Sequence, residues 1–327
     1  MSKNILITGS EGFIGSHLVQ HLLNKKYNVR AFVYYNSFNN IGWLSSLNKK
    51  ELKKINIHFG DIRDEKNVFA AFKNINYVIH LAALIGIPYS YYSPKSYIET
   101  NINGTYNILE ASLKKKINKL LVTSTSEVYG SARKIPIEEN HILQAQSPYA
   151  ATKIAADKLT ESYCKSFGLN ATIVRPFNTF GPRQSNRAII PTIITQLLNK
   201  NILKIGSLTP KRDFNYVENV AKTFEKILFS SKFKGEEVNI SSGKSISIES
   251  LIYRIANLID KKVKIKIDNI RIRPKNSEID NLLGSSKKLN KSIRFKKVSF
   301  NEGLKKTIDW FKNEENLKKY DSDKYVL

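Results

Sequence analysis

Short apolar runs alternate with longer amphipathic segments through the first half of the chain. The runs are rich in Val, Ile, Leu and Phe and end in small or polar clusters, which is typical of strands buried on both faces of a parallel sheet. This alternation predicts an α/β fold with a doubly wound parallel sheet. The predicted strands are NILITG, VRAFVYY, INIHFGD, YVIHLAA, KLLVTSTS and TIVRPFN.

The amphipathic segments predict helices that cover this sheet. The first runs from Phe13 to Asn24, and the two longest run from about Pro94 to Lys116 and from about Ser147 to Phe167, where Gly168 provides a C-cap stop. Ligands of parallel sheets bind at the carboxyl ends of the strands. The strand ends that we therefore expect to line one crevice are Gly9, Asp61, Ala82 and Thr125.

The pattern becomes irregular beyond Gly181, where prolines separate shorter elements. At 327 residues the chain is long enough for two closely packed lobes. We expect a dinucleotide-binding domain over residues 1–177 and a smaller, mainly substrate-binding lobe over 178–327, with elements near 214–242 returning to the first domain. No internal repeat is present in the sequence.

A glycine triplet, Gly9, Gly12 and Gly15, follows the first strand and opens the first helix. Missing side chains at such a turn allow the backbone and a dinucleotide pyrophosphate to approach each other at the positive end of a helix. A glycine triplet alone is a weak signal, and a purely structural tight turn is the alternative. The later motifs favour cofactor binding.

The end of the second strand lacks the acidic residue that would normally bind the adenosine ribose of NAD. Tyr34 and Tyr35 stand there instead, and no arginine follows directly to favour the extra phosphate of NADP. The choice between NAD and NADP therefore stays open. Asp61 is a better-placed acid for the adenine side, and its alternative role is to cap the helix that starts near Asp64.

Tyr149 and Lys153 stand four residues apart on the second long helix, just downstream of TSTSEVYG. This spacing puts a phenol and an ammonium group on one face, one turn apart, so that the cation can stabilise the phenolate. A tyrosine pKa of about 10 must fall by several units before the phenolate acts as a base near neutrality. Such pairs also occur by chance on surface helices, but the glycine loop upstream favours a nicotinamide-dependent active site.

Charge and composition exclude several other classes of site. The chain has 53 basic and 28 acidic residues, a net charge of +25. The lysines are scattered with Ile and Asn, which indicates solvated faces better than a basic surface that binds nucleic acid.

Cys164 is the only cysteine, and the histidines lack ligand spacing, so a metal site is not expected. No apolar run suits a signal or a membrane span, which predicts a cytoplasmic protein that does not bind membranes.

Seven motifs together resemble the extended short-chain dehydrogenase/reductase family, specifically its nucleotide-sugar epimerases, dehydratases and decarboxylases. They are GSEGFIGSH, HFGDIRD, HLAA, TNINGT, TSTSEVYG, YAATK and RPFNTFGP. The resemblance implies a Rossmann-type lobe with tightly held NAD(P), a lobe for a nucleoside diphosphate sugar, and a homodimer formed through the two long helices. The residues that it places at the cofactor, besides Tyr149 and Lys153, are Gly9, Gly12, Phe13, Ile14, Gly15, Asp61, Ile62, Leu81, Ala82, Ala83 and Asn101.

Glu127 distinguishes subgroups within this family. In 4-epimerases a small or apolar residue usually follows the catalytic Ser/Thr pair, whereas 4,6-dehydratases have a glutamate that removes the C5 proton after C4 has been oxidised. UDP-glucuronate decarboxylases also carry TSEVYG, and a surface carboxylate is the structural alternative. Many hexose dehydratases have Asp before this Glu, but here Ser126 precedes it, so either Glu127 or Ser126 acting through water supplies the acid. Thr125 would bind the C4 oxygen.

Four longer stretches resemble the dehydratases of legionaminic acid pathways, which act on nucleotide-activated N-acetylglucosamine. They are ALIGIPYSYYSPKSYIETNINGT, RPFNTFGPRQSNRAIIPTIITQ, GSLTPKRDFNYVENV and IRPKNSEIDNLLGSSKK. By this resemblance Asn178 and Arg212 hold the sugar and diphosphate, with Arg187 and Arg273 as weaker candidates. Each arginine has an alternative role as a solvated charge or inter-lobe ion pair. A nucleotide-N-acetylglucosamine 4,6-dehydratase using NAD, or NADP, is the leading hypothesis; a nucleotide-uronate decarboxylase, a 4-epimerase and a non-catalytic dinucleotide sensor are the alternatives.

Overall fold

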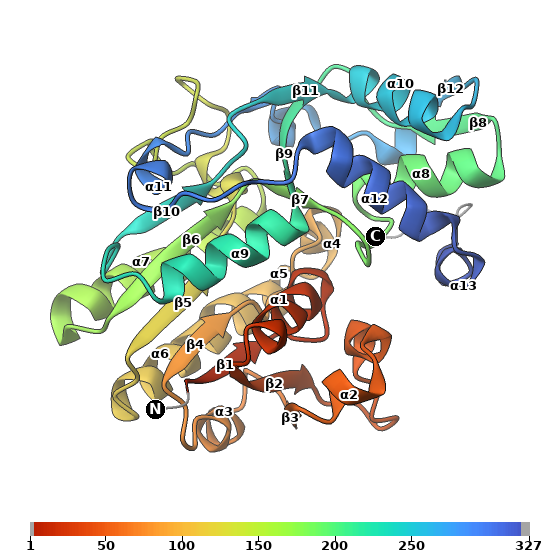
Figure 1. The fold of residues 1–327 in the computed structure, drawn as a ribbon. Helices are drawn as coiled ribbons and strands as arrows, with labels where there is room; N and C mark the ends of the chain where they lie inside the picture. Colours follow the sequence, from red (N-terminus) through yellow and green to blue (C-terminus); the bar gives the residue numbers. More distant parts are fainter. Residues whose placement is uncertain (1–2, 322–327) are drawn as a thin grey trace.

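The computed structural model describes residues 3–321 and contains a seven-stranded sheet in which every pair of neighbours is parallel (Figure 1). The strand order is β10-β6-β5-β4-β1-β2-β3. The strands are β1 (Asn4–Thr8), β2 (Asn28–Tyr34), β3 (Ile55–Gly60), β4 (Tyr77–His80), β5 (Lys119–Thr123), β6 (Ala171–Pro176) and β10 (Glu237–Ile240). This order reverses direction between β1 and β4, which confirms the predicted doubly wound, Rossmann-type fold.

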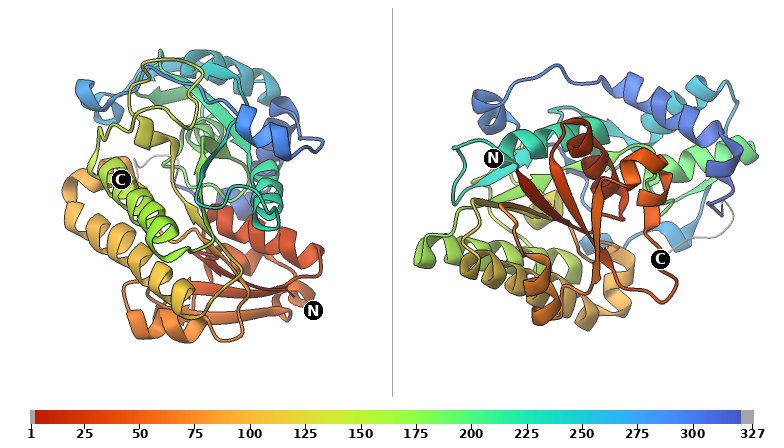
Figure 2. Two further views of the ribbon diagram at one scale, coloured as in Figure 1. Left: turned by 90° about the vertical axis from the view of Figure 1, so that its left-hand side faces the viewer. Right: turned by 60° about the horizontal axis from the view of Figure 1, so that its bottom comes forward.

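Helices cover both faces of this sheet, as Figures 1 and 2 show. Along β1, Ile5 and Ile7 pack with α1 and α9, whereas Leu6 packs on the opposite face with α3, α6 and α7. This alternation follows from the two-residue repeat of a strand and gives the sheet a core on each side. The covering helices are α1 (Phe13–Asn24), α3 (Glu65–Ala71), α6 (Gly104–Lys114), α7 (Pro148–Phe167) and α9 (Val217–Leu228).

The two long helices differ in regularity. The helix 148–167 has the expected signals, because the Ser147 side chain accepts a hydrogen bond from the Ala150 N–H and Gly168 ends the helix in the left-handed conformation. The helix expected over 94–116 is not uniform: α5 (Pro94–Tyr97) and α6 flank a π-helical segment, Ile98–Asn103. The local sequence pattern does not reveal this wider turn, which places Asn101 against α7.

The predicted fourth and fifth strands are shorter than expected. β4 ends at His80 and β5 ends at Thr123, so residues 81–83 and 124–126 follow the strands instead of belonging to them. The Thr8 hydroxyl holds the chain just after β4, because it accepts hydrogen bonds from the N–H groups of Leu81 and Ala82, each 3.1 Å long. Thr125 instead caps the 3-10 turn Ser126–Tyr129.

The second lobe contains two small sheets and its own apolar core. In one sheet β9 (Lys211–Tyr216) pairs with β7 (Asn178–Phe180), β11 (Ser245–Ser247) and β13 (Asn281–Leu282), and in the other β8 (Ile202–Ile205) pairs with β12 (Lys264–Ile267). After β9 the chain returns to the seven-stranded sheet, where α9 covers one face and β10 pairs with β6. The other helices are α2 (Lys49–Leu52), α4 (Ile87–Tyr92), α8 (Ile189–Asn199), α10 (Ile248–Ile259), α11 (Lys287–Ser292), α12 (Phe300–Lys312) and α13 (Glu314–Leu317).

Asp213 on β9 joins three segments of this second lobe. Its carboxylate is fully buried and accepts hydrogen bonds from Ser241, Ser242 and the N–H groups of Gly243 and Gly284. We expect Asp213→Ala to lower the free energy of unfolding by about 3 kcal/mol, because it leaves several buried donors without acceptors. Denaturant unfolding would measure the change.

The matched control is Asp309→Ala, which removes an exposed aspartate from α12. This control should change the free energy of unfolding by less than about 0.5 kcal/mol. Equal stability of the two variants would contradict the assigned role of Asp213.

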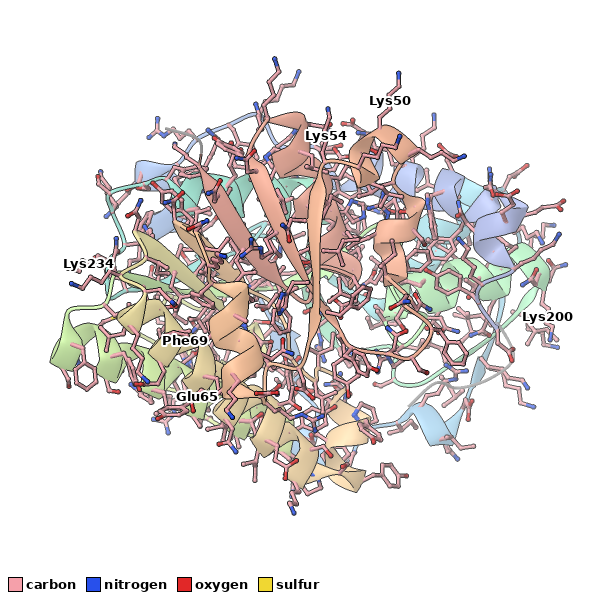
Figure 3. All side chains as sticks on the ribbon, turned by 90° about the horizontal axis from the view of Figure 1, so that it is seen from below. Lys50, Lys54, Glu65, Phe69, Lys200 and Lys234 are labelled. Atoms are coloured by element: carbon pink, nitrogen blue, oxygen red, sulfur yellow. The ribbon has the colours of Figure 1, made fainter. Side chains whose placement is uncertain are left out.

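Lysine side chains project from several parts of the surface, as Lys50, Lys54, Lys200 and Lys234 illustrate in Figure 3. They come from separate segments of both halves of the chain. Over residues 3–321, no helix combines the length and apolarity that a membrane span requires, and no group of three or more potential metal ligands lies together.

Candidate active site

The glycine loop follows β1 and leads directly into α1. Gly9 has a φ of 66°, and a Cβ atom there would lie 2.9 Å from backbone atoms of Ala82. A Cβ at Gly15 would overlap the carbonyl oxygen of Gly9. Only glycine therefore fits at these two positions, and the compact turn brings the N-terminus of α1 beside the end of β4.

The turn after β4 is held against the glycine loop by buried polar contacts. The His80 ring lies 2.8 Å from the Thr8 hydroxyl and 3.2 Å from that of Thr105, and burial lowers the pKa of His80 to about 3. A neutral imidazole therefore links β1, β4 and α6. Through Thr8, this network fixes Leu81 and Ala82 next to Gly9.

Asp61 and Ile62 follow β3 at the edge of the sheet. Asp61 does not cap the next helix: Asp64 does so, by accepting hydrogen bonds from the N–H groups of Lys66 and Asn67. Burial would raise the pKa of Asp61, but hydrogen bonds from Arg63 outweigh it, and the net shift is downward. Ile62 is buried. Asp61 is thus an ionised acceptor on the side of the crevice farthest along the sheet from β5.

The predicted catalytic pair lies where β5 and α7 meet. Burial raises the pKa of Tyr149, while a hydrogen bond with Thr125 acts in the opposite direction. The Lys153 ammonium donates a 2.6 Å hydrogen bond to the Thr123 carbonyl, and burial lowers the pKa of Lys153 to about 8. The geometry brings Thr125, Tyr149 and Lys153 together in a low-dielectric site, where small charge changes have large effects on proton affinity.

Asn101 connects the segment after β4 to α7, the helix that carries Tyr149 and Lys153. Its side chain accepts from the Leu84 N–H and donates to the Leu84 carbonyl and to the Thr152 hydroxyl, over distances of 2.9, 2.9 and 3.1 Å. The π-helical segment presents this amide to α7. In this structure Asn101 holds the segment after Ala83 beside Tyr149, which is a positioning role.

Glu127 is close enough to act electrostatically on both Tyr149 and Arg212. Its carboxylate raises the pKa of Tyr149 through its negative charge and also interacts with the Arg212 guanidinium. Arg212 is buried, donates 2.6 Å hydrogen bonds to Glu278 and to the Ile279 carbonyl, and lies close enough to Arg273 for the two charges to repel. Arg212 therefore interacts both with the Glu127 carboxylate and with the neighbouring Arg273.

Arg273 is the less satisfied of these two arginines. Its Nη1 atom is buried and has no hydrogen-bond partner within the described part of the chain. A buried guanidinium nitrogen without an acceptor is costly unless a ligand supplies one. This arrangement suits a diphosphate, which presents several acceptor oxygens.

The other predicted residues come from both halves of the chain. Asn178 begins β7, directly after the short link from β6. Arg187 is exposed and lies beside Gly86 and near the Tyr97 hydroxyl. The Tyr97 ring packs edge-on against the Tyr149 ring, with 6.2 Å between the ring centroids. Ser126 is buried in the turn between Thr125 and Glu127. Phe13 and Ile14, at the start of α1, pack into the cores, with only part of each side chain exposed.

Sequence reasoning missed a buried network behind the catalytic pair. Asp157 accepts hydrogen bonds from Ser124 at 2.9 Å and from Arg175 at 3.1 Å, and its negative charge favours the protonated form of Lys153. The signal was an acid four residues after Lys153 on the same helix. Asp157 therefore supports the charge of Lys153 from within the protein.

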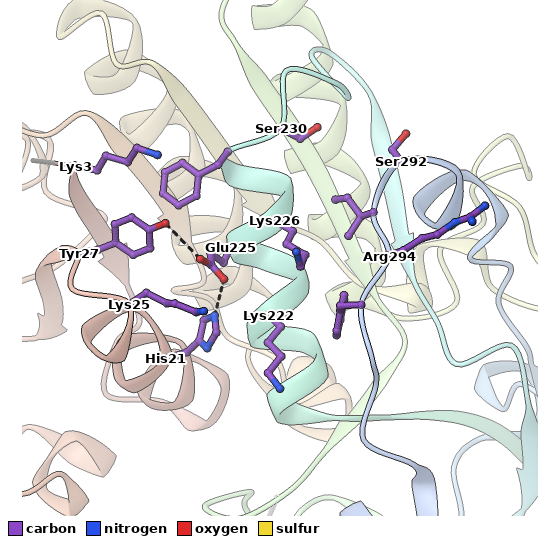
Figure 4. Close-up of a pocket in the computed structure, with 13 residues that line it drawn as sticks. Lys3, His21, Lys25, Tyr27, Lys222, Glu225, Lys226, Ser230, Ser292 and Arg294 are labelled. Carbon is purple, nitrogen blue, oxygen red and sulfur yellow. Dashed lines mark hydrogen bonds and ion pairs between the residues drawn. The ribbon is translucent and has the colours of Figure 1, made fainter. Parts of the chain in front are cut away.

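A separate pocket of about 510 Å³ lies between α1, α9 and the segment after α11 (Figure 4). Its Glu225 carboxylate accepts from Tyr27 and forms a 2.8 Å pair with His21. Lys3, Lys25, Lys222, Lys226 and Arg294 add positive charge around it. None of the predicted site residues lines this pocket, so it is distinct from the crevice described above.

Comparison with known proteins agrees with this geometry. A family model described as GDP-mannose 4,6 dehydratase matches residues 6–307. A dTDP-D-glucose 4,6-dehydratase from Dictyostelium discoideum is 32% identical over 369 residues, covering 96% of this chain and 82% of that protein.

Two solved structures have the same fold over nearly the whole chain. The UDP-N-acetylglucosamine 4-epimerase from Methanobrevibacter ruminantium M1, in complex with UDP-N-acetylmuramic acid, superposes with a TM-score of 0.86 and 31% identity, covering 96% of this chain and 99% of that one. The dTDP-glucose 4,6-dehydratase DesIV from Streptomyces venezuelae, with NAD and TYD bound, gives a TM-score of 0.84 and 25% identity, covering 97% and 99%. With its glycine loop and its buried tyrosine and lysine, the chain belongs to the GDP-mannose 4,6-dehydratase family of nucleotide-sugar dehydratases and epimerases.

Proposed function

We propose that the protein is a nucleotide-sugar 4,6-dehydratase that uses bound NAD and acts on a GDP- or UDP-N-acetylglucosamine substrate. The observation that carries the proposal is the position of Glu127, whose charge acts on both Tyr149 and Arg212. A carboxylate between the base at O4 and the arginines for the diphosphate is well placed to reach C5 of the same sugar. The N-acetylglucosamine specificity rests on the resemblance to dehydratases of legionaminic acid pathways.

NAD, held at the glycine loop, would supply reversible hydride transfer for the oxidation at C4 and the reduction at C6. Tyr149 takes the O4 proton, Thr125 orients the C4 oxygen, and Lys153 stabilises the phenolate. Glu127 then removes the C5 proton, which the new C4 ketone has made acidic. A proton from Glu127, or from water held by Ser126, joins the departing C6 hydroxyl, so the C6–O bond breaks, one water molecule leaves and a C5–C6 double bond remains. When the hydride is restored at C6, C5 takes a proton from the solvent, and Tyr149 releases the O4 proton to the solvent in exchange. The product is a 4-keto-6-deoxy sugar.

The cofactor is proposed to lie along the strand ends. Gly9, Gly12 and Gly15 would receive the pyrophosphate at the start of α1, and Asp61 would receive the adenine. The buried Nη1 of Arg273 and the Arg212 guanidinium would bind the sugar-linked diphosphate, with Asn178 at the sugar.

A homodimer is also proposed, formed through α6 and α7, which lie side by side on one flank of the sheet (left view of Figure 2). Tyr106 and Phe167 on these helices are 46% and 59% exposed. Sedimentation should therefore give twice the 37.3 kDa mass of one chain, and a single-chain mass at micromolar concentration would contradict this proposal.

The reaction can be tested by incubating the purified protein, without added reductant, with GDP- and UDP-N-acetylglucosamine and with UDP-glucuronate. Loss of one water from an N-acetylglucosamine substrate would support the proposal and identify the nucleotide. Loss of carbon dioxide from the uronate would instead indicate a decarboxylase. An unchanged mass with altered C4 stereochemistry would indicate a 4-epimerase, the second activity found among the relatives.

A further inference from the structure

The structure supplies an acid at the end of β2, although the sequence has none there. β2 ends at Tyr34, and the N–H of Tyr34 donates a 2.9 Å hydrogen bond to the Oε1 atom of Glu11. Glu11 belongs to the glycine loop, directly before Gly12. Its carboxylate thus reaches from one side of the dinucleotide crevice to the strand end where a ribose-binding acid normally stands.

The loop after β2 fixes Glu11 in this position. The Trp43 N–H donates a 2.9 Å hydrogen bond to the Glu11 carbonyl, and Gly42 packs so closely that a Cβ atom there would lie 2.9 Å from the Glu11 Cβ. The Asn36 side chain stabilises the same loop by accepting from the N–H groups of Phe38 and Asn40. Glu11 is therefore held at its side chain by Tyr34 and at its backbone by Trp43.

One oxygen of this carboxylate lacks a partner. Glu11 Oε2 is buried and has no hydrogen-bond donor among residues 3–321. Burial raises the pKa of Glu11, and the hydrogen bond from Tyr34 only partly offsets this effect. A buried carboxylate oxygen without a donor is costly, and a ligand hydroxyl that donates to it would remove the cost.

We propose that Glu11 replaces the missing strand-end acid, accepts a hydrogen bond from the 2′-hydroxyl of the adenosine ribose, and thereby selects NAD over NADP. A 2′-phosphate would place like charge against the carboxylate. Arg63, whose Nη2 atom lies 3.5 Å from the Tyr34 hydroxyl, is paired with Asp61 at 2.6 Å and so does not offset this repulsion. The inference rests on the cofactor part of the proposed function and is independent of the sugar.

The test is a titration of the full-length protein, freed of bound nucleotide, with NADH and with NADPH, followed by nicotinamide fluorescence. The wild type should bind NADH on the order of 100-fold more tightly than NADPH. In Glu11→Gln the amide oxygen still accepts from Tyr34, but the charge is gone. This variant should bind NADH more weakly and NADPH more tightly, which lowers the ratio by about tenfold or more.

Two controls separate this role from a purely structural one. Glu65→Gln removes a carboxylate from α3, where it pairs with Lys114 on the surface, and should leave the affinity ratio unchanged. If Glu11 only anchors the loop, Glu11→Gln would weaken both nucleotides in parallel or change neither, and either result overturns the inference. Equal affinities of the wild type for NADH and NADPH would also overturn it. Failure of both nucleotides to bind would instead refute the cofactor proposal itself.

Discussion

Replacing Tyr149 with phenylalanine is expected to lower kcat by about 10²- to 10⁴-fold, the usual contribution of a general base, with the substrate identified by the mass experiment. The variant keeps the buried ring and its packing against Tyr97 but removes the hydroxyl that takes the O4 proton. Lys153 cannot take over this role directly, because its ammonium donates to the Thr123 carbonyl. Steady-state turnover, together with the NADH dissociation constant, would measure the effect.

Charge on the cofactor would be needed for Tyr149 to act as the proposed base. Without it, burial raises the pKa of Tyr149 and lowers that of Lys153 to about 8, so both shifts oppose the required ion pair of phenolate and ammonium. Asp157 favours the charged lysine from behind, and an oxidised nicotinamide ring would add positive charge near the phenol. We therefore expect Tyr149 to act as a base only when the cofactor is bound.

Tyr163→Phe is the matched control for this prediction. It removes a hydroxyl from the same helix, where Tyr163 donates to Glu110 on α6, away from the crevice. We expect its turnover to stay within about twofold of the wild type, because phenylalanine keeps the buried ring and only a hydroxyl away from the proposed site is lost. Normal turnover by Tyr149→Phe would show that another group removes the O4 proton.

The sequence predicts best those features that depend on neighbours in the chain. Gly9 and Gly15 are required by a turn within one strand-helix unit, and Gly168 ends its helix through its own backbone conformation. Tyr149 and Lys153 lie on one face because a helix repeats about every four residues. Each of these inferences needs only local geometry, and the structure has each residue in the expected element.

Features that depend on contacts between distant segments cannot be predicted from the local sequence pattern. Glu11 reaches Tyr34 only because the loop after β2 folds back over the glycine turn. Arg212 and Arg273 come together through the pairing of β9 with β13, which no spacing in the sequence announces. Their assignment came from resemblance, and the structure adds that Arg212 interacts with both Arg273 and Glu127.

The π-helical segment shows a further limit of periodicity. Residues 98–103 continue the amphipathic pattern of the flanking helices, so an uninterrupted helix was expected. The wider turn is favoured by tertiary contacts instead: Asn101 satisfies both polar groups of Leu84 and reaches Thr152 on α7. π-Helical turns occur frequently at functional sites, where they re-aim a side chain.

Replacing Glu127 with glutamine should stop water elimination while the first oxidation step continues. Glutamine has nearly the same shape but cannot take the C5 proton, so we expect loss of dehydrated product by about 10²- to 10⁴-fold. The hydride removed from C4 would then stay on the cofactor, and NADH absorbance should build up after substrate is added. Exchange of the C5 hydrogen with deuterated solvent should be lost in parallel.

The combination of these readouts separates the role of Glu127 from that of Tyr149. Tyr149→Phe should produce neither NADH absorbance nor C5 exchange, because oxidation at C4 comes first, whereas Glu127→Gln should produce the absorbance alone. Glu138→Gln is the matched control, since Glu138 is an exposed acid that pairs with Lys287 outside the crevice. Undiminished dehydration by Glu127→Gln would contradict its role as base. It would also remove the observation that favours a dehydratase over a 4-epimerase, because Tyr149, Lys153 and Thr125 serve both reactions equally.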